Sequence, residues 1–118
     1  MTVTTNLFRH VDETQDFKAG QTIFAEGEYG DVMYVVVDGE VNLIDHSGNI
    51  SEVVLPGGMF GEMALIDSKP RSLTAVARTD CKLAPVDRKR FGFMVTETPY
   101  FALHVMQVMA ERLRRRGG

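Results

Sequence analysis

The segment that most constrains the fold of this chain is VMYVVVD at residues 32–38, which Gly39 follows directly. Its residues are β-branched or aromatic in a nearly unbroken run, and such a composition is typical of a strand that is buried on both faces. The pair Asp38-Gly39 is a strong hairpin signal. We therefore expect residues 40–45 to return as the partner strand of residues 32–38.

Similar short runs with strand composition continue on both sides of this segment, and turn-forming residues separate them. Many short strands with closely spaced turns indicate a β-sandwich or a jelly-roll barrel, also called a double-stranded β-helix. The expected strands are residues 16–18, 22–24, 32–38, 40–45, 50–55, 73–77 and 82–86.

Two helices are expected after the last strand. Asp87 is a favourable N-cap for a helix at residues 88–95. Thr98-Pro99 repeats the start signal for a longer helix at residues 100–115, with threonine at the cap and proline at the first helical position. The fold class we expect is therefore mainly β, with two C-terminal α-helices.

The length of the chain fits one domain with one core, because it has 118 residues. Hydrophobic residues make up 44% and charged residues 25%, which is ordinary for a globular protein. We expect the domain to occupy residues 14–116, with the β-roll at residues 14–86 and the C-terminal helices at residues 87–116. Residues 1–13 form a separate N-terminal segment, for which we expect a short helix.

Charge and cysteine content narrow the function classes further. The formal net charge is −3, whereas a general nucleic-acid binder is normally basic, so we expect no direct DNA binding by this chain. The single cysteine, Cys81, excludes an internal disulfide and fits a reducing cytoplasm. No apolar run approaches the roughly 20 residues of a membrane-spanning helix, so no membrane span is expected.

Residues 59–73 have the composition of an anion-binding site. Gly61 lets the backbone approach a ligand closely, because it has no Cβ. Residues 62–66 are expected to form a short helix, and the free N–H groups at a helix start attract phosphate. Arg71 follows Pro70 and offers a planar fork of donors that can hold two phosphate oxygens.

Glu62 would repel a phosphate, so its expected role is to accept a hydrogen bond from a sugar hydroxyl. Together with Arg71, it indicates a ribose phosphate that carries one negative charge. Met63 and Ala64 would contribute backbone N–H groups, and Ser72 would reach the phosphate through its hydroxyl or its N–H. Structural alternatives stay open, because Glu62 could merely stabilise its own helix, Arg71 could lie on the surface, and Ser72 could line a strand.

The segment FGEMALIDSKPRS also carries a family resemblance. It resembles the phosphate-binding cassette of cyclic nucleotide-binding domains, whose pattern is roughly F-G-E-x-A-L-x-x-x-x-P-R-[AST]-A. The residues in register are Phe60, Gly61, Glu62, Ala64, Leu65, Pro70, Arg71 and Ser72. The resemblance extends from about residue 15 to residue 115, and it is shared with catabolite-activator-type regulators, kinase regulatory subunits and cyclic nucleotide-gated channels.

The resemblance implies a jelly-roll fold and a set of ligand-binding residues. These are Phe60, Gly61, Glu62, Met63, Ala64, Arg71, Ser72 and Leu73. Leu73 departs from the pattern, because the family usually has a small alanine there, so the floor of the pocket is expected to be narrower or shifted.

The function we expect is a cyclic nucleotide sensor, with cyclic AMP as the first ligand and cyclic GMP as the second. No cofactor and no catalytic activity are expected. Ligand binding would pull the cassette inward, and the C-terminal helices would then repack over the purine, which is a population shift. The output partner would be an effector protein or a further domain, since the chain is either a free-standing sensor or a fragment.

Two other function classes remain open. A jelly-roll metalloenzyme would need an H-x-H pair on one strand, but His10, His46 and His104 are far apart in sequence, so no metal site is expected. The other alternative is a degenerate domain that binds no nucleotide and serves as a dimerisation or protein-docking module. Leu73 is the residue that keeps this second alternative open.

The last helix carries an apolar stripe with heptad-like spacing, formed by Ala102, Met106, Met109 and Leu113. We expect this stripe to be buried against the barrel, against the same helix of a second subunit, or against each in turn. Four arginines lie at the end of the helix. They could favour the helix C-terminus electrostatically, lead into a further domain or cover the base, and they are Arg112, Arg114, Arg115 and Arg116.

Overall fold

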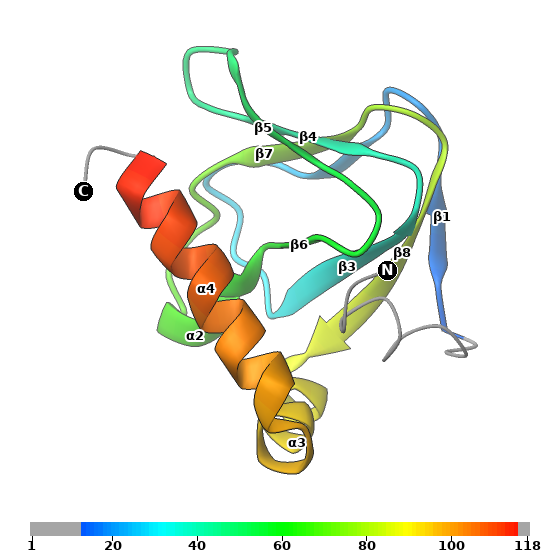
Figure 1. Cartoon of the computed structure of the whole chain (residues 1–118). Helices are drawn as coiled ribbons and strands as arrows, with labels where there is room; N and C mark the ends of the chain where they lie inside the picture. Colours follow the sequence, from blue (N-terminus) through cyan, green and yellow to red (C-terminus); the bar gives the residue numbers. More distant parts are fainter. Residues whose placement is uncertain (1–12, 116–118) are drawn as a thin grey trace.

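The computed structural model describes residues 13–115, which fold into two antiparallel sheets and three helices (Figure 1). The first sheet has the strand order β1-β8-β3-β6, and the second has the order β2-β7-β4-β5. The strands of the first sheet are β1 (Gln15–Phe17), β8 (Cys81–Asp87), β3 (Val32–Asp38) and β6 (Met59–Phe60). The strands of the second sheet are β2 (Thr22–Phe24), β7 (Thr74–Ala77), β4 (Val41–Ile44) and β5 (Ile50–Val54).

The expected hairpin between residues 32–38 and residues 40–45 is wrong. The strand β3 pairs with β8 and β6, whereas β4 pairs with β5 and β7 in the other sheet. The turn at Asp38-Gly39 is present, with Gly39 at a φ of 85°, but it carries the chain from one sheet to the other. The long register between β3 and β8, from Val32 opposite Asp87 to Asp38 opposite Lys82, takes the place of the local pairing.

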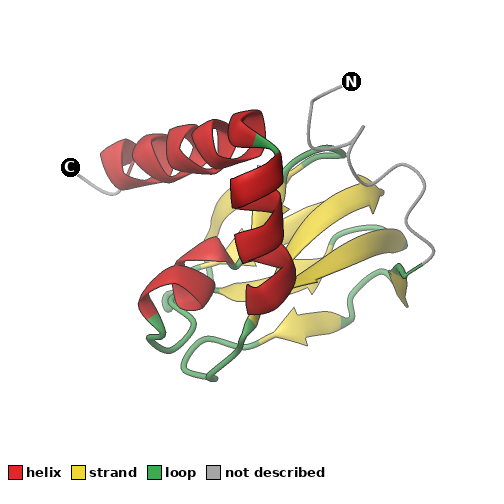
Figure 2. Cartoon of the chain, turned by 90° about the horizontal axis from the view of Figure 1, so that it is seen from below, coloured by secondary structure: helices red, strands yellow, loops and turns green. Residues whose placement is uncertain are grey.

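The strand β3 is buried on both faces, as its composition predicts. Val35 belongs to a core cluster between the first sheet and the helices, and Val36 belongs to a second cluster between the two sheets. Both side chains are fully buried. The domain therefore has three layers, with the helices on the outer side of the first sheet (Figure 2).

The helices are α2 (Glu62–Asp67), α3 (Arg88–Glu97) and α4 (Pro99–Arg115). The Asp87 carboxylate accepts a hydrogen bond from the backbone N of Arg90 at 2.8 Å, which confirms the predicted N-cap. The helix α4 begins at Pro99, also as predicted.

The buried face of α4 differs from the predicted stripe. Phe101 and Val105 face the core, whereas Met106 is 58% exposed and Leu113 is 53% exposed. Met109 is partly buried and packs against the core. The part of the stripe that carries Met106 and Leu113 is therefore open to solvent in the single chain.

The short helix expected within residues 1–13 falls almost entirely outside the described residues. The strand β6 was not expected, because two residues are too short to show a sequence period. The structure confirms a mainly β domain, and closure of its two sheets into a jelly-roll barrel stays a prediction. Within residues 13–115, no helix is long and apolar enough to cross a membrane.

Candidate functional site

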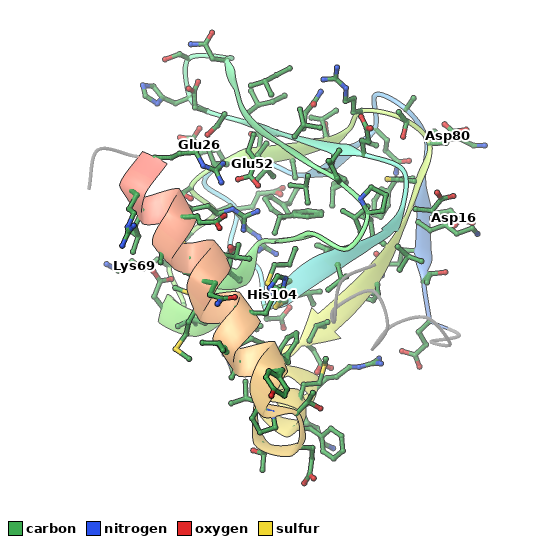
Figure 3. The ribbon with its side chains drawn as sticks, in the orientation of Figure 1. Asp16, Glu26, Glu52, Lys69, Asp80 and His104 are labelled. Atoms are coloured by element: carbon green, nitrogen blue, oxygen red, sulfur yellow. The ribbon has the colours of Figure 1, made fainter. Side chains whose placement is uncertain are left out.

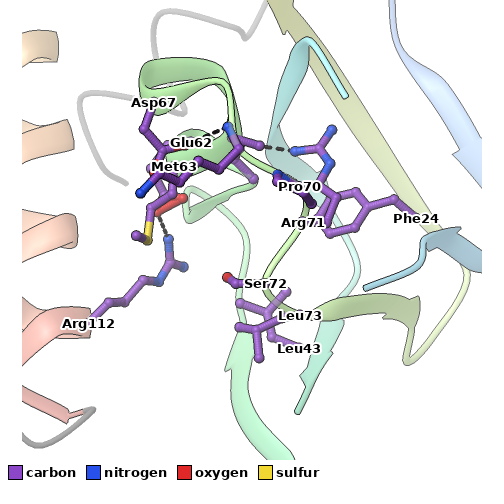
Figure 4. Close-up of a pocket in the computed structure, with 13 residues that line it drawn as sticks. Phe24, Leu43, Glu62, Met63, Asp67, Pro70, Arg71, Ser72, Leu73 and Arg112 are labelled. Carbon is purple, nitrogen blue, oxygen red and sulfur yellow. Dashed lines mark hydrogen bonds and ion pairs between the residues drawn. The ribbon is translucent and has the colours of Figure 1, made fainter. Parts of the chain in front are cut away.

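A cavity of about 280 Å³ opens where α2, the loop after it, β2, β4 and α4 come together (Figure 4). Its volume is near the lower end of the roughly 300–1,000 Å³ that is usual for small-molecule sites. The lining residues come from segments far apart in sequence, and they are Phe24, Leu43, Gly61, Glu62, Met63, Ala64, Asp67, Lys69, Pro70, Arg71, Ser72, Leu73 and Arg112.

Gly61 makes the turn from β6 into α2. Its φ of 81° lies in the left-handed region that favours glycine. A Cβ at this position would also lie 2.8 Å from Nη1 of Arg71, so a side chain would collide with the guanidinium. Gly61 is therefore needed both for the backbone turn and for the close approach of Arg71.

Arg71 is 6% exposed and reaches from the end of the loop to the start of α2. Its Nη1 donates to the carbonyl oxygen of Gly61 at 3.0 Å, and its Nη2 donates to the carbonyl oxygen of Val32 at 2.7 Å. The guanidinium also lies 4.0 Å above the centre of the Phe24 ring. These contacts fix the side chain in place. Within residues 13–115, Nε and the second N–H of each terminal nitrogen are left as donors.

Burial lowers the pKa of Arg71 from its ordinary value. An arginine nevertheless stays charged at neutral pH, because its ordinary pKa is so high. The cavity therefore has a rigidly held cation on one wall. This is the arrangement that a phosphate-binding group needs, since little side-chain entropy remains to be lost when the anion arrives.

Glu62 is the first residue of α2 and is 3% exposed. A buried carboxylate is costly unless it is paired. Its partner is Arg112 from the far end of α4, which forms a buried ion pair with Oε1 of Glu62. Figure 4 shows this pair at the edge of the cavity.

Seven of the eight predicted site residues line the cavity, and the eighth does not. The seven are Gly61, Glu62, Met63, Ala64, Arg71, Ser72 and Leu73. Phe60 is fully buried and belongs to the core between the sheets, where its ring stacks on that of Tyr34 with a centroid distance of 5.4 Å. Its place in the cassette is structural, because it anchors the start of the loop in the core.

Leu73 lines the cavity beside Leu43, and it is half-buried against the core between the sheets. The larger side chain is thus accommodated, and a cavity remains next to it. Ser72 is exposed, so its hydroxyl and its backbone can both be approached from solvent.

Three other residues of the site have weaker sequence signals. Phe24 and Gly30 lie on separate segments, and only the fold brings them to Arg71: a Cβ on Gly30 would lie 2.7 Å from Cζ of Arg71. Arg112 is one of four arginines at a helix end, and that clustering in the sequence does not distinguish it from the other three. Its spacing of 11 from Phe101 and 7 from Val105 places it on the buried face of α4, and that spacing could have identified it.

The arrangement can hold an anion beside Arg71 and a hydroxyl beside Glu62. Three cations and two carboxylates line the cavity, namely Lys69, Arg71, Arg112, Glu62 and Asp67, so the lining carries a formal excess of one positive charge. Among residues 13–115, no group of three histidine, cysteine, aspartate or glutamate side chains is placed to hold a metal ion.

Comparisons with known proteins agree with this geometry. The chain is 34% identical over 104 residues to the "CRP-like cAMP-activated global transcriptional regulator" of Mycobacterium tuberculosis, and the match covers 85% of this chain and 46% of the relative. The chain thus spans about half the length of this relative.

Solved structures show the same fold. One, reported as "A cyclic-GMP-dependent signalling pathway regulates bacterial phytopathogenesis", matches with a TM-score of 0.80 and 27% identity, covering 96% of this chain and 94% of the other. The catabolite activator protein of Thermus thermophilus matches with a TM-score of 0.79 and 28% identity, covering 94% of this chain and 59% of the other.

The family model described as "Cyclic nucleotide-binding domain" matches residues 14–97, which include all strands and the whole cassette. This match covers more than half of the chain. The chain belongs to the cyclic nucleotide-binding domain family.

Proposed function

We propose that this chain binds a cyclic nucleotide in the cavity beside α2, and that binding is coupled to the position of α4. The observation that carries the proposal is that Arg71 and Glu62 line the same cavity, one as a fixed cation and the other as a buried carboxylate. In this proposal, Arg71 holds the cyclic phosphate and Glu62 accepts a hydrogen bond from the ribose hydroxyl.

The other predicted residues have supporting roles. The backbone N–H groups of Met63 and Ala64, at the start of α2, contribute to phosphate binding. Ser72 contributes its hydroxyl or N–H, and Leu73 forms part of the apolar floor. These roles agree with the position of each residue on the cavity wall.

Cyclic AMP and cyclic GMP share the phosphate and the ribose, so the cavity as described gives no strong reason to reject either. The relative from Mycobacterium tuberculosis is named for activation by cAMP, and one structural neighbour is reported for a cyclic-GMP-dependent pathway. We place cyclic AMP first, and competition between the two nucleotides on the purified chain decides the order.

We further propose that the chain pairs with a second copy through the exposed side of α4. Tyr100, Leu103, Met106 and Leu113 are apolar or aromatic residues of this helix and are 47% to 72% exposed. Exposed apolar side chains that repeat along one helix are typical of an interaction surface. In the whole protein, a regulatory role in the cytoplasm with an effector protein or a further domain as output fits this arrangement.

Isothermal titration calorimetry with cyclic AMP and cyclic GMP tests the proposal. Wild type should bind, and Arg71→Ala should bind about ten- to hundred-fold more weakly, because a hydrogen bond to a charged group contributes roughly 1.5–3 kcal/mol. Arg78→Ala is a matched control. Arg78 is a surface arginine whose side chain is 46% exposed and pairs with Glu40 away from the cavity.

The control should bind with unchanged affinity. Equal affinity of Arg71→Ala and wild type would show that the ligand binds elsewhere. Absence of binding by a folded wild type would favour the alternative, in which the domain is a dimerisation or docking module that takes no nucleotide.

A further inference from the structure

An exposed cation stands at the rim of the cavity, on the loop between α2 and Arg71. Lys69 lines the cavity and is exposed to solvent. Figure 3 shows it at the periphery of the molecule. Its ammonium group forms no ion pair with any other residue in the range 13–115. The three N–H donors of this ammonium are therefore available to a ligand that approaches from solvent.

The backbone on both sides of Lys69 is anchored. The carboxylate of Asp67 accepts a hydrogen bond from the backbone N of Lys69 at 3.0 Å. On the other side, the ring of Pro70 restricts the chain, and the backbone N of Arg71 donates to the carbonyl oxygen of Glu28 at 2.8 Å. The flexible side chain of Lys69 therefore moves around a fixed point beside the cavity.

The charge of Arg112, another cation of the lining, is offset at close range. Its Nε donates to Glu52 at 2.9 Å, and its Nη1 donates to Glu62. Burial by itself would raise the pKa of Glu52, but the hydrogen bond from Arg112 lowers it overall, so this carboxylate is charged at neutral pH. Arg115 also contacts Glu52 at 2.9 Å, so two carboxylates balance two guanidinium groups at this end of the cavity.

The charge of Arg71 is also partly hidden from solvent. This side chain is 6% exposed, and its burial lowers its pKa, whereas the charges of Asp31, Glu28 and Glu62 act in the opposite direction. These carboxylates are thus close enough to weaken the potential that Arg71 projects outward. The whole chain has a formal net charge of −3, so an anion in solution approaches a protein of like charge.

From these observations we infer that Lys69 is a steering residue, which raises the rate at which a cyclic nucleotide enters the cavity, whereas Arg71 holds the phosphate after it has arrived. A charge at a binding site speeds the association of an oppositely charged ligand, and salt screens this effect. This inference rests on the proposed function, because it concerns the entry of the same ligand.

The chemistry of lysine suits this role. Its ammonium is a compact, hydrated charge on a flexible chain, so it attracts an anion without imposing one geometry. Immobilising such a side chain on the bound ligand would cost conformational entropy, which offsets the gain from a direct contact. The effect of Lys69 is therefore expected on the association rate and hardly at all on the dissociation rate.

The size of the effect follows from Coulomb's law. One unit charge acting on another across several ångströms of water changes a rate by about threefold. Lys69→Gln removes one unit of charge, and Lys69→Glu changes the local charge by two units. We therefore expect association rates that are lower by about threefold and about tenfold at an ionic strength of about 10 mM, where screening is weak.

Stopped-flow fluorescence measures both rates, with cyclic AMP that carries a fluorophore on the purine and leaves phosphate and ribose unmodified. Lys18→Glu is the matched control, because it changes the net charge by the same two units. Lys18 is exposed, does not line the cavity and follows β1, which lies on the opposite side of the domain from α2 (Figure 1). Lys69→Arg tests whether a retained charge is sufficient.

The steering role predicts a specific pattern. Lys69→Arg and Lys18→Glu should associate at nearly the rate of wild type. The slower association of Lys69→Gln and Lys69→Glu should disappear at an ionic strength of about 1 M, where the screening length is only about 3 Å. Dissociation rates should stay within about twofold of wild type in all variants, since Arg71 is unchanged.

Three results would overturn the inference while leaving the proposed function standing. One is an unchanged association rate of Lys69→Glu at low ionic strength. Another is equal slowing by Lys18→Glu, which would mean that the net charge of the chain controls entry. The third is a change confined to the dissociation rate, which would make Lys69 a direct contact of the bound ligand. Failure of folded wild type to bind would refute the proposed function, and the steering role with it.

Discussion

The position of Arg71 depends on the absence of a side chain at Gly30, and this gives a sharp prediction. A Cβ at Gly30 would lie 2.7 Å from Cζ of Arg71. Non-bonded carbon atoms prefer a separation of about 3.5 Å or more, so the guanidinium would have to move by roughly 0.8 Å. Gly30 does not have a positive φ, and the substitution Gly30→Ala therefore tests this collision without adding backbone strain.

A shift of that size stretches or misaligns the hydrogen bonds that now fix the guanidinium. The bond from Nη2 to the Val32 carbonyl is 2.7 Å long, and the bond from Nη1 to the Gly61 carbonyl is 3.0 Å long. Overpacking of this kind typically costs about 1–3 kcal/mol of stability. We also expect cyclic nucleotide affinity to fall by about tenfold or more, which corresponds to about 1.4 kcal/mol.

Urea unfolding and calorimetric titration of Gly30→Ala measure the two effects. Gly92→Ala is the matched control, because Gly92 lies in α3 and a Cβ there would meet no atom within 4 Å. It should leave affinity unchanged and raise stability by about 0.5–1 kcal/mol, since alanine is the better helix former. A Gly30→Ala protein with the stability and affinity of wild type would refute the view that Gly30 makes room for Arg71.

Three further predictions concern the dimer, the response to acid and the charge of the ligand. Met106→Glu should sediment as a folded monomer that keeps its affinity for cyclic nucleotide. It should lose no more than about 0.5 kcal/mol of stability, because Met106 is exposed. A wild type that stays monomeric at high concentration would contradict the dimer. The folded-state pKa of Glu52 is lowered, so the stability that this carboxylate contributes is present above its ordinary pKa of 4.5 and is lost as pH falls through the lowered pKa. Unfolding at a series of acidic pH values should therefore show a smaller loss of stability in Glu52→Gln than in wild type. The acyclic 5′-monophosphate carries nearly two negative charges, and it should compete more weakly than cyclic AMP, because the second charge must also be desolvated and the lining has only one excess positive charge. Equal competition would contradict this.

The elements with local sequence signals were predictable, and the pairing between them was not. The composition of β3 indicated its burial on both faces, and Asp87 and Pro99 marked the starts of α3 and α4. The turn at Asp38-Gly39 also formed, but a local signal cannot tell whether a turn closes a hairpin or leads into another sheet. That choice was made by β8, which lies more than 40 residues further along the chain and pairs along nearly the whole of β3.

The cassette could be located from sequence because its glycine, glutamate and arginine fall within one continuous segment. The contacts that hold it could not, since they come from elsewhere. Gly30 reaches Arg71 only through the fold, and Arg112 reaches Glu62 from 50 residues away. The apolar periodicity of α4 was also misleading, because it counted Met106 and left out Arg112. A buried arginine is rare unless carboxylates are placed to pair with it, and that placement is a property of the tertiary structure.

The two sides of α4 are physically connected, and this links the proposals for ligand binding and for the dimer. Arg112 faces the cavity and is held by Glu62, whereas Met106 and Leu113 are exposed to solvent on the same helix. A helix of 17 residues moves largely as one body, so a change in the docking of Arg112 also moves the exposed apolar side chains.

If those side chains form the contact with a second copy, nucleotide and second copy must each change the affinity for the other by the same factor. The sign of that factor depends on whether docked α4 presents Met106 and Leu113 better than undocked α4 does, and in the docked arrangement described above both side chains are already more than half exposed. Docking of α4 therefore leaves the apolar surface available, and the dissociation constant of the dimer, measured by sedimentation with and without cyclic AMP, gives the sign of the factor.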